Sequence, residues 1–406
     1  MDRHGRKDRQ PVRDPVGAAV QPRVVIVGGA IVGSCVAYFL RMSGFEGAVT
    51  VVEQDPSYRR SSTSLSAASI RTQFGTPVNI HMSLFGAEFL RTVKSRFGPE
   101  ADVGFVERGY LILGGPETVE ARRAGAAMQR SQGADVSVLS PQETAARFPW
   151  INTDGLGIAT TAEHHEGWFD AWALLSLVRR GAKDLGVDYV HAKASAIAIT
   201  AGRVTGVKLD DGSVLQADWC VNAAGPGSGR LVRSVGIHLP VEPRKRTVFS
   251  IKAPLDRSGF PMLFDVSGAW IRPEGEGFIC GIAPPEDEDP DATDDFDAAH
   301  ELLENALWPA LAHRVPALEE LRVESAWAGH YEVNTLDHNG VIGFHDEVAN
   351  LIFATGFSGH GVMHAPATGR GVAELITRGA FRSIDLSALG YHRVRSGTPL
   401  HETVVY

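Results

Sequence analysis

The stretch Arg23–Glu53, RVVIVGGAIVGSCVAYFLRMSGFEGAVTVVE, decides the fold of this chain. It opens with the apolar run Val24–Val27, which is typical of a parallel strand buried on both faces. A glycine-rich turn follows, and apolar residues then recur at helical spacing as far as Gly44, which is well placed to end a helix. Val49–Val52 predicts a second strand ending on Glu53. Together these segments predict one βαβ unit of a nucleotide-binding sheet.

The glycine-rich turn predicts a site for a dinucleotide pyrophosphate. Amides at a helix N-terminus point at the ligand, and the helix dipole favours negative charge there. Glu53, twenty residues after the last glycine of the turn, is placed to accept hydrogen bonds from a ribose. The middle glycine of the usual pattern is replaced by Ala30, but the strand, the helix and Glu53 all fall where the motif needs them. The predicted contacts are Gly28, Gly29, Ala30, Ile31, Val32, Gly33 and Glu53.

Three further segments favour FAD over NAD as the dinucleotide. Ser61–Ser64 follows the second strand and offers hydroxyl groups and backbone donors. Asn222–Gly225 ends a later strand, and Ala354–Gly361 ends the last strand and opens a helix. Separated glycine turns suit a long, extended FAD that touches one sheet edge repeatedly. The additional predicted cofactor contacts are Ser62, Thr63, Ser64, Ala194, Ala224, Gly225, Gly356, Ser358, Gly359, His360 and Gly361.

The rest of the chain alternates between segments that predict helices and segments that predict strands. Residues 172–185 predict a helix. Residues 241–330 have aromatic residues, alternating apolar positions and turn signals, which favour an antiparallel sheet with one helix near 296–312. Leu351–Ala354 predicts a final strand, and 367–378 the helix after its turn.

This order of elements predicts an α/β fold (α+β overall). It would combine a Rossmann-like, discontinuous FAD-binding domain with an inserted antiparallel-sheet substrate domain. The predicted division is a disordered tail at 1–21, the FAD-binding domain at 22–100, 155–239 and 334–385, the substrate domain at 101–154 and 240–333, and a C-terminal extension at 386–406.

Composition excludes several classes of function. The net charge of −9 argues against non-specific nucleic-acid binding. The three cysteines are far apart and lack metal-ligand spacing, so we expect no metal site and a reducing compartment. No run approaches the roughly 18 apolar residues of a membrane span. Residues 1–21 mix bases with acids, unlike a targeting peptide. We therefore expect a cytoplasmic protein.

Two charged segments are expected to be solvated. Residues 286–297 contain eight acids and no base, and they lack the glycine that a Ca²⁺ loop needs at its turn. A solvated acidic loop is the favoured interpretation. Arg244-Lys245-Arg246 is a short basic cluster, which either meets the flavin or a substrate acid or is a solvated strand end. The solvated strand end is favoured.

Several motifs together resemble the D-amino-acid-oxidase superfamily of flavoproteins. They are Pro-Trp-Ile-Asn-Thr at 149–153, Pro-Val-Glu-Pro-Arg-Lys-Arg at 240–246 and Ala-Thr-Gly-Phe-Ser-Gly-His-Gly at 354–361. The resemblance covers nearly the whole chain after residue 22 and is closest to the FAD-dependent oxidoreductase domain-containing proteins, relatives of sarcosine oxidase and dimethylglycine dehydrogenase. It implies hydride transfer to flavin from the carbon next to nitrogen in an amino-acid-like secondary or tertiary amine, followed by hydrolysis of the imine.

The resemblance also implies roles for single residues. Arg71 matches a sarcosine oxidase arginine that grips the substrate carboxylate. Glu332 stands where relatives place an arginine or tyrosine, so either the substrate carries a second positive group or Glu332 forms a structural ion pair. His330 and Ser66 match positions that carry the covalent flavin link in some relatives, and Ser66 cannot form it. We therefore expect non-covalent FAD, with His330 as the residual candidate for a link and His360 as a donor near the flavin.

Two missing lysines shape the expected reaction. Met363 and Ile279 stand where sarcosine oxidase carries a substrate-binding lysine and a lysine that helps O₂ to react. These replacements imply a substrate other than sarcosine, and a dehydrogenase that passes electrons to an unidentified acceptor. In the segment Glu166–Asp170 the match to the family favours a structural role, with Asp170 as a helix N-cap.

Two alternative functions stay open at this point. One is a 2-hydroxy-acid dehydrogenase of the same superfamily, which would need His360 or His330 as the base that takes the hydroxyl proton. The other is a non-catalytic, FAD-bound assembly factor, because close relatives are linked to the assembly of respiratory complexes.

Overall fold

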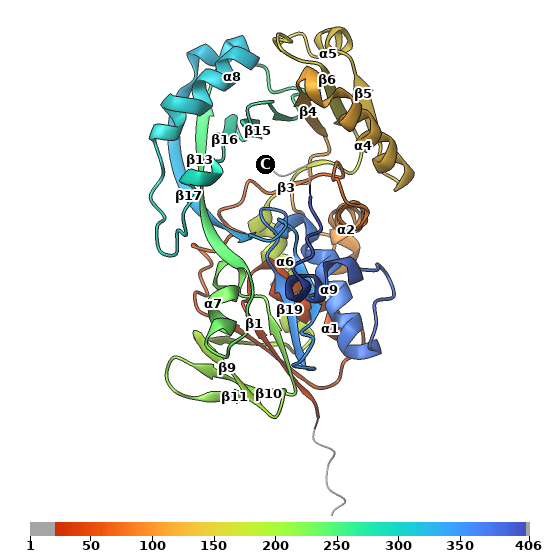
Figure 1. Ribbon diagram of the computed structural model, residues 1–406, viewed down its shortest axis with the longest axis vertical. Helices are drawn as coiled ribbons and strands as arrows, with labels where there is room; N and C mark the ends of the chain where they lie inside the picture. Colours follow the sequence, from red (N-terminus) through yellow and green to blue (C-terminus); the bar gives the residue numbers. More distant parts are fainter. Residues whose placement is uncertain (1–20, 403–406) are drawn as a thin grey trace, which may run out of the picture.

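Strand β1 (Arg23–Val27) lies inside a six-stranded sheet in the lower half of Figure 1. The computed structural model describes residues 21–402, so the tail predicted for residues 1–21 lies outside them except for Gln21. Neighbouring strands of this sheet are parallel, except for the edge pair formed by the first two strands of its order. The order is β18 (Val341–Phe344), β19 (Leu351–Thr355), β12 (Trp219–Asn222), β1, β2 (Ala48–Glu53) and β8 (Asp188–His191).

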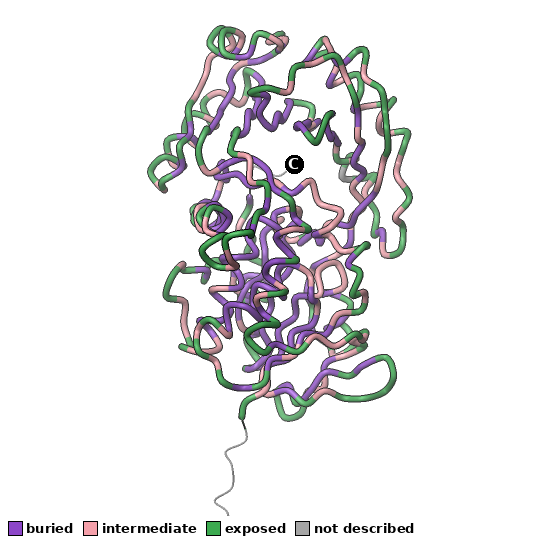
Figure 2. Tube along the Cα trace, turned by 180° about the vertical axis from the view of Figure 1, so that it is seen from behind, coloured by how far each residue is buried: buried purple, intermediate pink, exposed green. Residues whose placement is uncertain are grey.

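The two faces of the six-stranded sheet are covered by different layers, which explains the continuous apolar run of β1. Val24 and Ile26 pack into the core formed with α1 (Ile31–Met42), α6 (Ala171–Asp184) and α9 (Gly361–Arg378). Val25 and Val27 point the opposite way, toward α7 and a three-stranded sheet. Figure 2 shows the buried trace concentrated in this part of the molecule. The covering elements are α7 (Ser228–Arg233), β9 (Ala194–Thr200), β10 (Arg203–Leu209) and β11 (Val214–Gln216).

An eight-stranded sheet forms the upper half of Figure 1. Its strands pair antiparallel, as predicted, except for β14 and β4, which are parallel. It includes β6, although residues 158–162 fall in a segment predicted for the FAD-binding domain. The order is β17 (Arg322–Asn334), β13 (Val241–Lys252), β16 (Gly277–Gly281), β15 (Trp270–Glu274), β14 (Met262–Phe264), β4 (Tyr110–Gly114), β6 (Ile158–Ala162) and β5 (Val136–Leu139).

The alternation of side chains in β4 shows how this sheet is covered. Leu111 and Leu113 pack in a core with Leu307 and Leu311, whereas Tyr110 and Ile112 pack in a separate cluster with Trp168. The predicted helix near 296–312 begins later, at residue 301, continues as a π-helix over Leu303–Leu307 and ends with α8 (Trp308–Arg314). It starts late because residues before it are docked against the sheet, as described below.

The helix before the C-terminal extension is longer than predicted. α9 begins at Gly361 rather than at 367 and continues through Pro366. Residues 362–369 of this helix are buried, so packing outweighs the helix-breaking tendency of proline. Asp170 caps α6 as predicted, because its Oδ1 accepts from the Ala173 amide at 2.9 Å. The remaining elements used below are α2 (Pro77–Arg91), β3 (Ser69–Ile70), β7 (Gly167–Trp168) and α10 (His392–Ser396).

Candidate active site

The three predicted glycine turns lie at one edge of the six-stranded sheet. They follow β1, β12 and β19, which are adjacent and parallel, so their carboxyl ends meet. The first two turns are joined directly, since the Ala223 amide donates to the Val27 carbonyl at 2.9 Å. Ligands of open α/β sheets bind at this edge. The sheet thus brings together segments about 330 residues apart in the chain.

The first turn accepts no side chain at two of its glycines. Gly28 has φ +98°, and an added Cβ would lie 2.2 Å from the Ala223 carbonyl oxygen. A Cβ on Gly33 would lie 1.9 Å from the Gly28 oxygen. Ala30, the departure from the usual motif, precedes α1 with φ −67°, a conformation open to any L-residue. The alanine is therefore compatible with the turn.

Polar groups around this turn fit the pyrophosphate and ribose of FAD. Glu53 Oε2 accepts from the Gly29 amide at 2.8 Å, and burial raises the pKa of its carboxyl group. Thr63 Oγ1 accepts from the Ile31 amide at 3.3 Å. Within residues 21–402, the amides of Val32 and Gly33 have no acceptor, as expected for the first turn of a helix. These amides would hold a pyrophosphate.

The second and third turns present left-handed backbone toward the same edge. Gly225 has φ +55°, and the preceding Ala224 amide donates to Asn222 Oδ1 at 3.2 Å. Gly359 has φ +99°, and an added Cβ would lie 2.5 Å from Tyr331 Cε2. Gly359 thus allows the turn to pack against the aromatic ring of β17.

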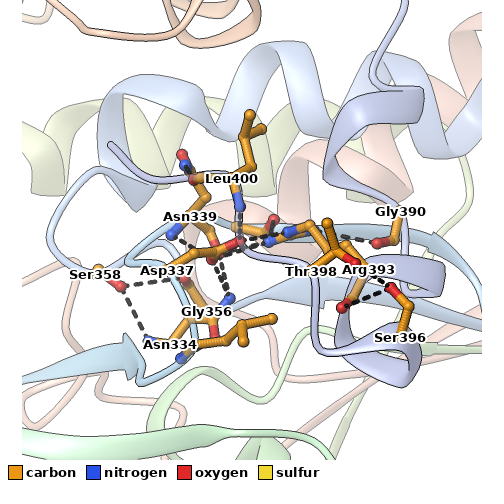
Figure 3. Close-up of polar contacts among 12 residues, drawn as sticks. Asn334, Asp337, Asn339, Gly356, Ser358, Gly390, Arg393, Ser396, Thr398 and Leu400 are labelled. Carbon is orange, nitrogen blue, oxygen red and sulfur yellow. Dashed lines mark hydrogen bonds and ion pairs between the residues drawn. The ribbon is translucent and has the colours of Figure 1, made fainter. Parts of the chain in front are cut away.

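The C-terminal extension braces the third turn (Figure 3). Ser358 Oγ accepts from the Asn334 amide at 3.0 Å, so its hydroxyl is engaged within the protein. The Asn334 side chain donates to Asp337 Oδ1 at 2.9 Å, and Asp337 Oδ2 accepts from Arg393 Nε at 2.7 Å. The Leu400 amide also donates to this carboxylate at 3.0 Å. Residues 393–400 thereby hold the segment that positions the turn.

Three other predicted FAD contacts are Ser62, Ser64 and Ala194. Ser62 Oγ donates to the His330 carbonyl at 2.7 Å, and Ser64 Oγ accepts from Ser61 Oγ at 3.1 Å. Ala194 begins β9, in the three-stranded sheet. The side chains of Ser62 and Ser64 are therefore used within the protein.

Arg71 lies at the centre of a buried polar cluster after β3. Its side chain donates to the Gln73 carbonyl, and its Nη2 lies 3.2 Å from His360 Nε2. Its Cζ lies 3.9 Å from the ring centroid of Phe74, a cation–π contact. Arg71 is 3% exposed. Thus the structure brings together two of the predicted catalytic residues, Arg71 and His360, at the N-terminus of α9.

His360 is a neutral imidazole in this cluster. Burial, Arg71 and His364 all hold the pKa of His360 well below its usual value. A guanidinium only donates, so Nε2 accepts from Arg71 and the proton resides on Nδ1. Burial also lowers the pKa of His364 to about 3, and His364 Nε2 lies 3.1 Å from Ser83 Oγ. The predicted donor role of His360 therefore requires its Nδ1.

Glu166 fixes the loop that carries Arg71. Its carboxylate accepts from the Thr72 amide at 2.7 Å, the Thr72 hydroxyl at 2.7 Å, the Gln73 amide at 3.1 Å and the Gln73 side chain at 2.9 Å. Burial raises its pKa, and these donors oppose the rise. The structural role expected for the segment Glu166–Asp170 has this physical basis.

The Glu332 carboxylate does not form the ion pair predicted for it. Within residues 21–402, no Lys, Arg or His nitrogen lies within 4 Å of its carboxylate. Oε2 instead accepts from the Thr355 hydroxyl at 2.8 Å. Burial raises the pKa of Glu332 to about 7, partly opposed by Thr355 and the Gly356 and Phe357 amides. The ion-pair interpretation is therefore wrong, because the partners are neutral.

We expect Glu332→Gln to flatten the pH dependence of stability in the apoprotein. The folded pKa lies above the unfolded value of about 4.3, so stability is fully present below that value and is lost as the pH rises through 7. The wild type should lose roughly 2–3 kcal/mol more than the variant between pH 5 and pH 9. Urea unfolding at both pH values measures this difference. The exposed Glu46→Gln serves as the control, and parallel curves for wild type and Glu332→Gln would contradict the pKa assignment.

His330 belongs to a contact that the sequence did not predict. Its Nε2 donates to the Asp295 carbonyl at 2.6 Å, and its ring stacks on Phe296 at 4.0 Å between centroids. Asp295 also pairs with Lys245 at 2.5 Å. Two acids of the segment 286–297, Asp289 and Asp295, thus pair with Arg246 and Lys245. The solvated strand end is therefore wrong for the basic cluster, which lies inside β13, whereas most of the acidic loop is exposed, as predicted. The Arg60 guanidinium lies over Phe296, which adds a cation–π contact.

A cavity between the loop 62–67 and the eight-stranded sheet contains residues that the sequence analysis did not place in the site. Beside the predicted Ser62 and His330, its lining includes Arg246, Trp270 and Tyr331. The aromatic members had no motif of their own. The basic cluster was the available signal for Arg246, and the acidic segment was the signal for its partner.

Metal ligation and membrane insertion are the two other kinds of function considered for the described residues. Within residues 21–402, no group of three or more His, Cys, Asp or Glu side chains is arranged to hold a metal ion. Over the same residues, no helix combines the length and hydropathy that crossing a membrane requires.

Comparison with known proteins identifies the family. The sequence model of the family described as FAD dependent oxidoreductase (DAO) matches residues 23–375. FAD-dependent oxidoreductase domain-containing protein 1 of Xenopus laevis is 42% identical, over 93% of this chain and 84% of that protein. Human mitochondrial sarcosine dehydrogenase is 25% identical, over 88% of this chain and 40% of that protein.

A solved structure agrees with the sequence comparison. L-proline dehydrogenase from P. horikoshii superposes with a TM-score of 0.82 at 27% identity, covering 93% of this chain and 98% of that one. The match includes both sheets described above, since it extends over nearly all of both chains. The chain therefore belongs to the DAO family of FAD-dependent oxidoreductases, and FAD is its cofactor.

Proposed function

We propose that this protein oxidises the C–N bond of an amino-acid-like secondary or tertiary amine. The substrate loses a hydride from the carbon next to nitrogen, and water hydrolyses the resulting imine. Bound FAD supplies the two-electron acceptor. The observation that carries the proposal is the buried Arg71 paired with neutral His360 beside the third glycine turn. The names of two similar proteins, sarcosine dehydrogenase and L-proline dehydrogenase, support an N-substituted amino acid.

Arg71 is the proposed binding group for the substrate carboxylate. A planar guanidinium offers two parallel donors to such a group. The loop held by Glu166 keeps this guanidinium in place, so little conformational entropy is lost on binding. His360 Nδ1–H is an additional neutral donor next to it.

The protonation and hydrogen bonds of His360 and His330 favour an amine as the substrate over a 2-hydroxy acid. Oxidation of a hydroxy acid needs a base for the hydroxyl proton. His360 is a poor base here, because burial and Arg71 keep its pKa well below the usual value. His330 uses Nε2 to donate to a backbone carbonyl. A neutral amine substrate requires no strong base.

We also propose non-covalent FAD and an electron acceptor other than O₂. His330 is engaged with Asp295 and Phe296, which supports a structural role for it. Ile279 is a buried apolar residue of β16, opposite Ser250 and Arg272 in the neighbouring strands. It supplies no cation near the flavin.

Anaerobic reduction of the bound flavin tests the proposed function. N-methyl amino acids should bleach the flavin absorbance, whereas the matching 2-hydroxy acids should not. Bleaching by the hydroxy acids alone would establish the other reaction, and bleaching by neither class would leave a non-catalytic role. In the same preparation, acid precipitation should release the flavin into the supernatant. Reoxidation should be slow with O₂ and fast with a quinone.

A further inference from the structure

Arg246 forms a second guanidinium site on the wall of the cavity. It belongs to β13, inside the eight-stranded sheet, and lines the cavity with Trp270, His330 and Tyr331. Both of its terminal nitrogens bind Asp289, at 2.9 Å for Nη1–Oδ1 and 2.8 Å for Nη2–Oδ2. The two side chains are only 18% and 12% exposed. The structure thus contains a largely buried carboxylate held by a two-donor fork beside the candidate active site.

Arg246 belongs to a strand of the sheet, whereas Asp289 belongs to an irregular loop. β13 is paired with β17 along its whole length, but β16 pairs only with Val248–Ile251. The acidic segment lies along the edge left open, where the Ala292 amide donates to the Pro243 carbonyl at 3.1 Å. Apart from one short 3₁₀ turn at Glu286–Glu288 and an isolated bridge between Asp291 and Arg244, residues 285–297 have no helix or strand. Asp289 can therefore leave without disrupting the sheet that holds Arg246.

Arg246 and Arg71 are both close to the surroundings of Tyr331. The Tyr331 ring packs against Gly359, which precedes the His360 that pairs with Arg71. Arg246 Cζ is 5.3 Å from the ring centroid of Tyr331. Both guanidinium groups act electrostatically on the Tyr331 hydroxyl and lower its pKa, against a larger rise from burial. Glu332 points to the opposite face of β17 from Tyr331, because neighbouring residues of a strand alternate. Tyr331 therefore connects the surroundings of the two cations, and the Glu332 side chain lies on the other face of the strand.

We propose that Arg246 is a second carboxylate-binding site of this enzyme, occupied by Asp289 when no substrate is present. The substrate is then an N-substituted amino acid with a second acid group, one carboxylate on Arg71 and the other replacing Asp289 on Arg246. This inference rests on the proposed function, since Arg71 supplies the first site. The exchange keeps Arg246 paired throughout, so it avoids the cost of leaving a buried cation without a partner.

Replacement of Asp289 by a ligand carboxylate predicts how the affinities of two ligands should differ. A ligand with one carboxylate leaves the Arg246–Asp289 pair intact, so its affinity should not depend on either residue. A ligand with two carboxylates must compete with Asp289, which is tethered nearby at a high effective concentration. Removing the Asp289 charge should therefore tighten binding of the second ligand alone.

The test uses thiodiacetate and (methylthio)acetate with the FAD-loaded protein. Sulfur replaces the substrate nitrogen, so neither ligand presents an amine, and the pair differs by one carboxylate. Calorimetric titration should give about tenfold tighter binding of thiodiacetate to the wild type. Asp289→Asn should tighten thiodiacetate by about a further tenfold and change (methylthio)acetate less than about twofold. Arg246→Gln should remove the preference.

Asp295→Asn is the matched control. Asp295 belongs to the same acidic segment and also pairs with a base of β13, but its partner Lys245 does not line the cavity. Lys245 and Arg246 are neighbours in the strand and therefore point to opposite faces. This variant should change the affinity of neither ligand. An equal gain in Asp295→Asn and Asp289→Asn would overturn the proposal, because it would reflect general loosening of the segment.

Two results would count against the second site itself. Equal affinities for the two ligands in wild type and Asp289→Asn would overturn it, as would an equal loss for both ligands in Arg246→Gln. Both titrations measure binding without oxidation. If the ligands behave as expected but no amine bleaches the flavin, the second carboxylate site stands and amine oxidation fails. If amines bleach the flavin but thiodiacetate shows no preference, only the second site fails.

Discussion

Replacing Gly33 or Gly28 by alanine is expected to yield a protein that purifies without FAD. The new Cβ would lie 1.9 Å from the Gly28 oxygen in the first variant and 2.2 Å from the Ala223 oxygen in the second. Both obstacles are backbone atoms, so the turn or α1 must move instead of a side chain. Because the amides of this turn are placed to hold the pyrophosphate of FAD, we expect at least about a hundredfold loss of FAD affinity, or roughly 3 kcal/mol.

Gly44→Ala separates the clash from the cost of an unusual backbone conformation. Gly44 has φ +78°, close to that of Gly28, but an added Cβ meets nothing within 4 Å. This variant should retain FAD and lose only about 1 kcal/mol of stability. The ratio of flavin to protein absorbance and a fluorescence titration with FAD measure the effect, while circular dichroism reports the fold. Gly33→Ala protein that binds FAD within a few-fold of wild type would contradict the proposed geometry.

The sequence predicted those parts of the fold that depend on local patterns. The apolar run of β1, the glycine turn and Glu53 lie within 31 residues, and each has a periodicity or motif of its own. Asp170 was recognisable as a helix cap because its partner is three residues away. The alternating pattern of residues 241–330 predicted the antiparallel sheet. The family resemblance singled out Arg71 and His360 separately, but it did not predict their contact.

The parts that the sequence did not predict depend on partners far apart in the chain. Arg246 and Asp289 are 43 residues apart, and each looked solvated because no local pattern joins an acidic run to a basic one. Asp337 and Arg393 are 56 residues apart, so the role of the C-terminal extension in bracing Ser358 had no local signal. The partners of Glu332 are a hydroxyl and two backbone amides. Backbone amides are available at every position, so the residue type alone suggested an ion pair instead.

Arg71→Gln is expected to weaken binding of a single-carboxylate ligand such as (methylthio)acetate by about 10²- to 10³-fold. The variant loses the charged two-donor fork in a site where the guanidinium is 3% exposed, and losing a buried partner of a carboxylate costs about 3–4 kcal/mol. Arg71→Lys keeps the charge but offers no planar fork, so an intermediate loss is expected. Calorimetric titration of the FAD-loaded variants measures both effects. Arg91→Gln, at a surface pair with Glu107, is the control and should bind as wild type does.

A second measurement distinguishes a binding role for Arg71 from a purely structural one. The positive charge of Arg71 is one cause of the low pKa of His360. Arg71→Gln removes that charge, so the imidazole should titrate at higher pH than in the wild type, which NMR of the histidine side chains would detect. Arg71→Lys should keep the pKa of His360 low while still binding the ligand less tightly. A variant that retains its flavin, shows the raised pKa of His360 and nevertheless binds (methylthio)acetate as tightly as wild type would place the substrate carboxylate elsewhere.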